Sequence, residues 1–342
     1  MIDFAGYVEL ILVTLIGVPM NLFVLYLGSK LVRRSGHTNK LIVMSMTAAD
    51  LVFCSIHGPV MFSRFALKYV IPMELCILTY SASYVGSIAS SLSLLLLNVD
   101  KFLYLHKPLH YGLIVTRKRI ALGIALCWCI AISWVYLILF GPATDYQPPC
   151  HFIPRTIQVY IAFLIAFFAV PICTSFIISL YIVVLVLSSS RQLPKIRKGG
   201  NTSTCQLVRH VRHSARKRTS GAGHLKSIVF VFSTTLWAVF TCLPYRTIYA
   251  GLAAHGGNIE AYEVNMIILL CAFMAMSVNP VGNPFITIFT QRPYIRLVEE
   301  IWREVVGGKR RSGGNQMRFG DDVPRKSTRE TTEMTFSTTN NF

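Results

Sequence analysis

The sequence predicts an all-α membrane protein, a seven-transmembrane helix bundle with a short amphipathic eighth helix. Of its 342 residues, 53% are hydrophobic and only 14% are charged, whereas a soluble chain carries about 25% charged residues. The chain also contains seven long apolar stretches, and a helix needs about 20 apolar residues to cross the bilayer core. We therefore expect seven spans, at residues 4–27, 41–61, 75–98, 120–140, 157–187, 227–245 and 264–290.

The spans differ in the few charged residues that they hold. The first contains only Glu9, and it is too long and lacks the basic flank of a cleaved signal peptide, so we expect a signal anchor. The second contains Asp50 and His57. The third, fourth, fifth and seventh contain no Asp, Glu, Lys or Arg, and the sixth continues past Arg246 to about residue 254.

The distribution of basic residues predicts the orientation. All but four of the 33 Lys and Arg residues lie in segments 28–40, 101–119, 188–226 and 291–342. Basic loops stay in the cytoplasm, so we expect a multi-pass protein of the plasma membrane with an extracellular N-terminus. The net charge of +18 then lies beside an anionic lipid leaflet, which makes the bilayer the partner of these segments and argues against nucleic-acid binding.

The sequence also predicts the division of the chain into segments. Residues 1–3 form a short extracellular N-terminus, and residues 4–290 form the transmembrane domain. In residues 291–306 apolar side chains recur every three or four positions, which predicts a helix lying at the membrane surface. Residues 307–342 are rich in Gly, Arg, Ser and Thr, so we expect a disordered cytoplasmic tail.

Two cysteines are placed on the outer side by this topology. Cys76 opens the third span, and Cys150 lies in the loop after the fourth. Cysteines in one oxidising compartment can pair, so we expect a disulfide between them, with two free thiols as the alternative.

Characteristic residues follow one another along the seven spans. They are Asn21, Asp50, Asp100-Lys101-Phe102 followed by Pro108-Leu109, Trp128, Pro171, Cys242-Leu243-Pro244-Tyr245, Asn279, and Asn283-Pro284-Phe285-Ile286-Thr287. In this order the chain resembles the rhodopsin-like (class A) G-protein-coupled receptors over about residues 10–305. The resemblance implies a receptor, not an enzyme, that binds an extracellular ligand and activates heterotrimeric G proteins. It also implies an activation core made of Asn21, Trp128, Pro171, Cys242, Pro244, Pro284 and Thr287.

Two other classes of membrane protein compete with this interpretation. A transporter or channel would line a path with several intramembrane charges, whereas only Glu9, Asp50 and Arg246 qualify here, at different depths. An intramembrane enzyme would need a zinc motif such as HExxH or paired catalytic carboxylates, and the sequence has neither. The receptor interpretation is therefore favoured over both.

Asp50 is an intramembrane carboxylate and hence a candidate functional residue. The helical rise places Asp50, Ser90 and Asn283 about 13 to 16 Å from the inner ends of their spans. Together with Asn279, these oxygen-bearing side chains suit a small hard cation, and the family binds sodium at this position. The alternative is a protonated Asp50 in a hydrogen-bonded cluster.

Asp100 and Lys101, followed by Phe102, resemble the pair that switches these receptors. Lys101 stands where the family usually has Arg, and lysine lacks the planar fork of a guanidinium, so we expect a loosely latched inactive state. The alternative is a lysine that extends to solvent and an aspartate that caps the helix. Pro108 and Leu109 are the predicted G-protein contacts.

The resemblance also implies a ligand pocket between the outer halves of the helices. Its predicted residues are Ser83, Tyr84, Ser87, Tyr245, Arg246, Tyr249, Phe273, Met276 and Ser277. Amine receptors carry Asp at the position of Ser83, because a buried ammonium needs a counter-charge, and a retinal Schiff base needs a lysine that the seventh span lacks. We therefore expect neither an amine nor retinal, but a peptide whose carboxylate binds Arg246. A small acid is the alternative ligand. The alternative for Arg246 is an ion pair with Glu9 or Glu263, or a side chain that extends outward.

The tail carries a cluster of hydroxyl side chains. They are Ser327, Thr328, Thr331, Thr332, Thr335, Ser337, Thr338 and Thr339. Phosphorylation adds negative charge, so a receptor kinase and arrestin are expected partners, with a plain solvated tail as the alternative.

Overall fold

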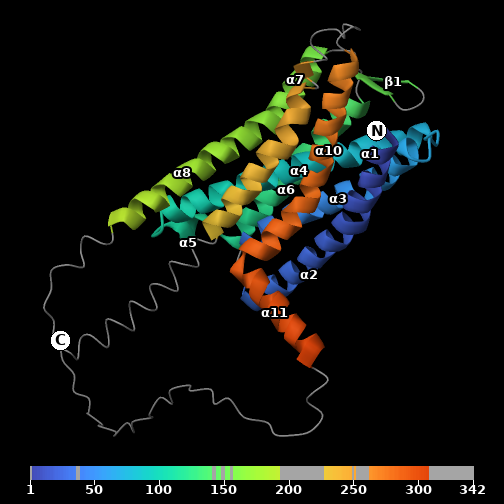
Figure 1. The fold of residues 1–342 in the computed structure, drawn as a ribbon. Coiled ribbons are helices and arrows are strands. Elements are labelled where there is room, and N and C mark those ends of the chain that lie inside the picture. The colour runs from blue at the N-terminus through green and yellow to red at the C-terminus, as the bar shows by residue number, and fades with distance from the viewer. Residues whose placement is uncertain are drawn as a thin grey trace, which may run out of the picture. The chain divides into compact units, whose positions relative to one another are not determined.

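The computed structural model describes residues 2–35, 39–140, 144–147, 151–154, 157–192, 227–248, 250–251 and 262–307. Within these ranges, seven helices are long and apolar enough to cross a membrane, which confirms the predicted fold class. They run over Asp3–Arg34, Asn39–Phe65, Met73–His106, Arg117–Leu137, Ile161–Ser188, Ser227–Ile248 and Ile267–Thr290. Figure 1 shows them side by side in one bundle, within the compact unit Met1–Glu300.

Two of the spans contain a π-helical segment. The first span consists of α1 (Ile2–Val8), η1 (Glu9–Gly17) and α2 (Val18–Ser35), and the fifth of α7 (Ile157–Leu164), η2 (Ile165–Ala169) and α8 (Val170–Gln192). Each π-helical segment ends two residues before a proline, Pro19 or Pro171. Proline has no backbone N–H to donate, so the preceding turn widens. In η2 this turn carries Phe168, whose side chain is fully buried.

The second span is α3 (Asn39–Phe65), the third α4 (Met73–His106), the fourth α6 (Arg117–Phe140) and the seventh α10 (Tyr262–Thr290). The sixth is the helix Ser227–Ile248. Helix α4 continues through Asp100 to His106 and is therefore longer than predicted. The short α5 (Tyr111–Ile114) lies between α4 and α6.

The predicted amphipathic helix is present as α11 (Arg292–Gly307). Tyr294 and Leu297 are buried, whereas Arg296 and Glu300 face solvent. Glu300 forms an ion pair with Arg34 at the end of α2, with 2.7 Å between Glu300 Oε2 and Arg34 Nη1. The apolar stripe predicted from the spacing therefore packs against the bundle at the start of this helix.

A β-hairpin was not predicted. Strands β1 (Thr144–Gln147) and β2 (His151–Pro154) pair antiparallel, with Thr144 opposite Pro154. Figure 1 places β1 at the end of the bundle where α1 begins, and α5 at the opposite end. We call these the outer and the inner end, after the predicted orientation.

Helix α4 lies at the centre of the bundle and contacts α3, α6 and α8. Its Tyr84 and Ile88 belong to a buried cluster with Phe163 and Phe168 of the fifth span. On the outside of the bundle, large apolar side chains such as Tyr136, Val184 and Phe240 are more than 60% exposed. A soluble protein rarely exposes a continuous apolar surface, so this surface faces lipid and the chain is a multi-pass membrane protein.

Candidate functional site

A cavity of about 460 Å³ opens between the outer halves of α3, α4, the sixth span and α10. Of the predicted pocket residues, Ser83, Tyr84, Tyr245, Arg246, Phe273 and Met276 line it. The structure adds residues that the sequence interpretation missed, namely His57, Met61, Arg64, Phe65, Thr79, Tyr80, Ile267, Leu269 and Leu270.

Two predicted pocket residues, Ser87 and Ser277, do not line this cavity. Ser87 lines a smaller cavity beside Asp50, because it lies one helical turn deeper than Ser83. Ser277 is 1% exposed and is not among the residues that line the outer cavity. Tyr249 lies outside the described residues.

The sequence contained a signal for one of the missed residues. His57 lies seven residues after Asp50 in α3, which is two helical turns and hence the same face. Since an intramembrane carboxylate faces the interior of a bundle, His57 must face the interior too. Its Nδ1 lies 2.7 Å from Ser83 Oγ.

Arg246 is enclosed by aromatic rings. Its guanidinium carbon lies 4.1 Å from the ring centroid of Phe168, 5.0 Å from that of Tyr84 and 5.5 Å from that of Tyr245. The residue is only 6% exposed, so the alternative in which its side chain extends outward is wrong. The ion pairs among the described residues do not include one between Glu9 and Arg246, so the alternative of pairing with Glu9 is wrong. The side chain of Glu263 lies outside the described ones.

Asp50 lies on a cavity of about 20 Å³ together with Ser87, Ser90, Ser91 and Asn279. This volume holds one water molecule or a small ion. Ser90 hydrogen-bonds to the Asp50 carboxylate, and Asn279 Oδ1 accepts from Thr241 at 2.9 Å. The structure thus brings together Asp50, Ser90 and Asn279 from three spans.

The fourth predicted cation ligand is placed differently. Asn283 donates from Nδ2 to Asp50 Oδ2 at 2.8 Å and is not among the residues that line this cavity. Its amide therefore orients the carboxylate, and Asn283 does not itself line the cavity where the cation is predicted.

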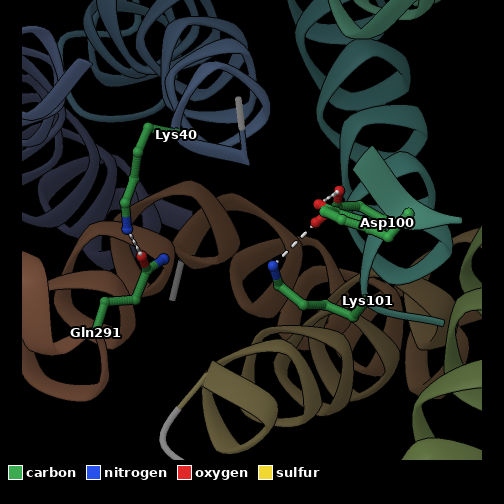
Figure 2. A network of polar contacts seen from close by, with 5 residues as sticks. Lys40, Asp100, Lys101 and Gln291 are labelled. Atoms are coloured by element: carbon green, nitrogen blue, oxygen red, sulfur yellow. Dashed lines mark hydrogen bonds and ion pairs between the residues drawn. The ribbon is translucent and has the colours of Figure 1, made fainter. Parts of the chain in front are cut away.

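At the inner end, Asp100 accepts two hydrogen bonds. Lys101 Nζ lies 2.9 Å from Asp100 Oδ2, and Tyr111 of α5 donates to Oδ1 at 2.7 Å. Figure 2 shows the Lys101 side chain reaching toward Asp100. The Lys101 side chain is 11% exposed and Asp100 lies inside α4, so the alternative of an extended lysine and a capping aspartate is wrong. Burial and the hydrogen bond to Asp100 raise the pKa of the Tyr111 phenol, which keeps it a donor.

A second lysine lies close to this pair. Lys40 Nζ donates to Gln291 Oε1 at 3.0 Å and lies 5.1 Å from the ring centroid of Tyr294. In Figure 2 Lys40 and Gln291 point toward each other beside Asp100 and Lys101. This contact ties the inner end of α3 to the junction of α10 and α11.

Three residues of the predicted activation core, Asn21, Trp128 and Thr287, donate hydrogen bonds to other residues of the bundle. Asn21 donates to the Pro280 carbonyl oxygen at 3.0 Å, Trp128 to Ser45 Oγ at 3.0 Å, and Thr287 to the Asn283 carbonyl oxygen at 2.8 Å. Pro171 follows η2, Pro284 lies inside α10, and Pro244 lies inside the sixth span. These residues connect the first span to the seventh and the second to the fourth.

Cys242 of the predicted activation core lines the Asp50 cavity. One turn further inward, the indole of Trp237 donates to the Asn279 carbonyl oxygen at 3.1 Å. It packs on Gly282 so closely that a Cβ there would overlap the ring. Trp237 therefore connects the sixth and seventh spans.

Another hydrogen bond between spans was not predicted. Asn98 Nδ2 of α4 donates to Thr235 Oγ1 of the sixth span at 3.1 Å. Both side chains are buried. This neutral contact joins the third and sixth spans near the inner end.

The predicted G-protein contacts lie at the inner surface of the bundle. Pro108 and Leu109 line an open groove with His106 and Leu113, and Leu109 is 90% exposed. Phe102 stacks on His106 with ring centroids 5.3 Å apart.

Cys76 takes part in a disulfide. Cys150 lies outside the described residues, so the pairing of Cys76 with Cys150 stays a prediction.

Known proteins resemble the chain in both sequence and fold. The family model "7 transmembrane receptor (rhodopsin family)" matches residues 20–286. The G-protein coupled receptor aex-2 of Caenorhabditis elegans is 29% identical over 297 residues, which is 84% of this chain and 81% of that protein. The human histamine H1 receptor is 30% identical over 129 residues, 37% of this chain and 26% of that receptor.

The bundle also superposes on squid rhodopsin with a TM-score of 0.71 at 16% identity, covering 89% of this chain and 87% of that one. This likeness concerns the fold. The family model covers most of the chain and includes the spans that carry Asp50, Asp100 and Pro284. The chain therefore belongs to the rhodopsin family of seven-transmembrane receptors, and it is a signalling receptor rather than an enzyme.

Proposed function

We propose that this receptor lies in the plasma membrane with its N-terminus outside, binds a peptide with a free carboxylate in the outer cavity, and activates heterotrimeric G proteins. One observation carries the choice of ligand. The described lining of the cavity contains two arginines, Arg64 and Arg246, and no Asp or Glu. A buried cation stabilises an anion, and the remaining wall is mainly aromatic and aliphatic, which suits a peptide side chain.

An amine ligand is the second candidate, because part of the chain is similar to histamine H1 receptors. A buried ammonium group needs an acidic partner. Ser83 lies where such a partner is expected, and the described lining of the cavity offers none. The two arginines of the lining thus favour a ligand with a carboxylate over an amine ligand.

Replacing Arg246 tests the ligand class. Cells with cAMP and calcium reporters would be challenged with peptides that end in a free carboxylate and with the same peptides ending in an amide. Loss of a charged hydrogen bond weakens binding by about tenfold or more, so Arg246→Gln should lower the potency of the free acids only. Lys68→Gln is the matched control, because Lys68 is exposed at the outer end and does not line the cavity. Equal potency of the acids on wild type and Arg246→Gln would exclude this ligand class.

At the inner end, Asp100, Lys101 and Tyr111 would release one another as the G protein binds. Leu109 supports this assignment, because its apolar side chain is almost fully exposed next to the switch and an apolar anchor suits a protein partner. A receptor kinase and arrestin would act on the hydroxyl cluster of residues 327–339, which lies outside the described residues.

Sodium is the proposed cation beside Asp50. The support is a carboxylate, three serine hydroxyl groups and an amide side chain on the lining of a cavity of ion size. Such oxygen ligands suit a hard cation, and Arg246 and Cys242 also line this cavity. Sodium there would hold three spans together and favour the inactive arrangement. The alternative remains a protonated Asp50 bonded to Ser90 and Asn283.

A further inference from the structure

His57 is held rigidly at the wall of the outer cavity. Its ring stacks on Phe53 with centroids 4.5 Å apart and lies 5.6 Å from the ring of Phe273. The residue is only 4% exposed, and it lines the cavity of about 460 Å³. Packing of this kind fixes the ring plane and hence the direction of both nitrogens.

The hydrogen bonds of Ser83 determine which nitrogen carries the proton. Ser83 Oγ donates to the Thr79 carbonyl oxygen at 2.7 Å, and a hydroxyl group has a single hydrogen. Ser83 Oγ must therefore accept from His57 Nδ1, which lies 2.7 Å away. A neutral imidazole that donates from Nδ1 carries a lone pair on Nε2. No carboxylate in the described lining would stabilise an imidazolium.

His57 Nε2 is thus a buried acceptor, and it has no hydrogen-bond partner among the described residues. Such groups are rare in folded proteins and call for an explanation. His57 and Arg246 line the same cavity, and they contact the neighbouring residues Ser83 and Tyr84 of α4, respectively. The lining of the cavity therefore includes both a histidine with an unpartnered acceptor and a buried cation.

We propose that His57 Nε2 accepts the last amide N–H of an N-acylated C-terminal residue whose carboxylate binds Arg246. In such a residue only the α-carbon separates the N–H group from the carboxylate, which suits an acceptor and a cation that line one cavity. The side chain of that residue faces Met61, Phe273 and Met276, which line the same cavity. This inference rests on the proposed binding of a carboxylate, and it makes His57 a specificity-determining residue for the adjacent amide.

Two probes that differ in one atom test the proposal. N-acetyl-phenylalanine has the N–H group, and 2-acetoxy-3-phenylpropanoic acid has an ester oxygen in its place. Each would be titrated against the thermal unfolding of the full chain in lipid nanodiscs at millimolar concentrations. An ester oxygen leaves Nε2 unsatisfied, so we expect wild type to bind the amide about tenfold more tightly.

Variants of His57 and Arg246 test the role of each residue separately. His57→Phe keeps the ring between Phe53 and Phe273 but removes the acceptor, so the preference for the amide should fall to about one. His57→Gln restores an acceptor in a similar place and should restore the preference, which a merely structural role would not do. Arg246→Gln should weaken both probes equally and leave their ratio unchanged.

The experiment distinguishes a failure of the His57 proposal from a failure of the proposed ligand class. If wild type binds both probes equally, or if His57→Phe keeps the preference, the role of His57 is refuted while carboxylate binding stands. N-acetyl-phenylalanine amide has no carboxylate, so tighter binding of this probe than of the acid refutes the proposed ligand class. If none of the three probes changes the unfolding temperature of wild type, both proposals are refuted.

Discussion

The hydroxyl group of Tyr111 should restrain signalling in the absence of ligand. It donates to Asp100 Oδ1 at 2.7 Å, and Tyr111→Phe removes this bond while keeping the ring that packs edge-on against Tyr104. A hydrogen bond to a carboxylate contributes about 1.5–3 kcal/mol when it is buried. Tyr111 is only half buried, so about 1 kcal/mol is the appropriate value, or about a fivefold change in an equilibrium constant. If the bond exists only in the inactive arrangement, basal activity should rise by about this factor.

The assay is ligand-independent cAMP and calcium signalling, normalised to the amount of receptor at the cell surface. Tyr181→Phe is the control, because Tyr181 also lies at the inner end and contacts Phe102 through its ring. Asp100→Asn should raise the basal signal at least as much, since it removes the charge that holds Lys101. A rise with Asp100→Asn and none with Tyr111→Phe would show that the tyrosine is not part of the restraint.

Three further changes have defined outcomes. Asn98→Ala removes the bond to Thr235 and should raise basal signalling in the same assay. Thr290→Ala should not, because the Thr290 hydroxyl group donates to the Ile286 carbonyl oxygen of its own helix. Gly282→Ala places a methyl group against the ring of Trp237 and should cost about 1–3 kcal/mol of stability in thermal unfolding. Gly251→Ala is the neutral control, because no described residue would lie within 4 Å of its methyl group. Sodium should raise the unfolding temperature of wild type over potassium at equal ionic strength, and Asp50→Asn should abolish this difference; a sodium effect that persists in the variant would place the ion elsewhere.

The sequence predicted the spans because a bilayer imposes a length and an apolar composition that a linear sequence displays directly. It also predicted that Asp50 and Ser90 lie at one depth, since the helical rise alone sets depth. Depth does not determine which side of a helix faces which neighbour. For this reason the expected position of Ser277 in the lining of the outer cavity was wrong. Ser87 was expected there too, but it lies one helical turn deeper than Ser83 and lines the cavity beside Asp50.

Other features depend on contacts between residues far apart in the chain. The hairpin pairs two strands of four residues each, which are too short to give a periodic signal. The bond of Asn98 to Thr235 spans 137 positions and joins two neutral side chains, so neither residue stood out by its charge. The π-helical segments follow from Pro19 and Pro171, but the sequence alone gave no measure of how far each helix would widen.

The replacement of arginine by lysine in the switch is balanced by Tyr111. An arginine can bind both oxygens of a carboxylate, whereas a lysine binds one, and here Lys101 binds Oδ2 and leaves Oδ1 to the tyrosine. The loose latch expected from the lysine alone therefore acquires a second donor from α5. If this is correct, Lys101→Arg should compete with Tyr111 for Oδ1, and the effect of Tyr111→Phe on basal signalling should shrink in the Lys101→Arg background. Additive effects of the two changes would show that arginine and tyrosine do not share the carboxylate.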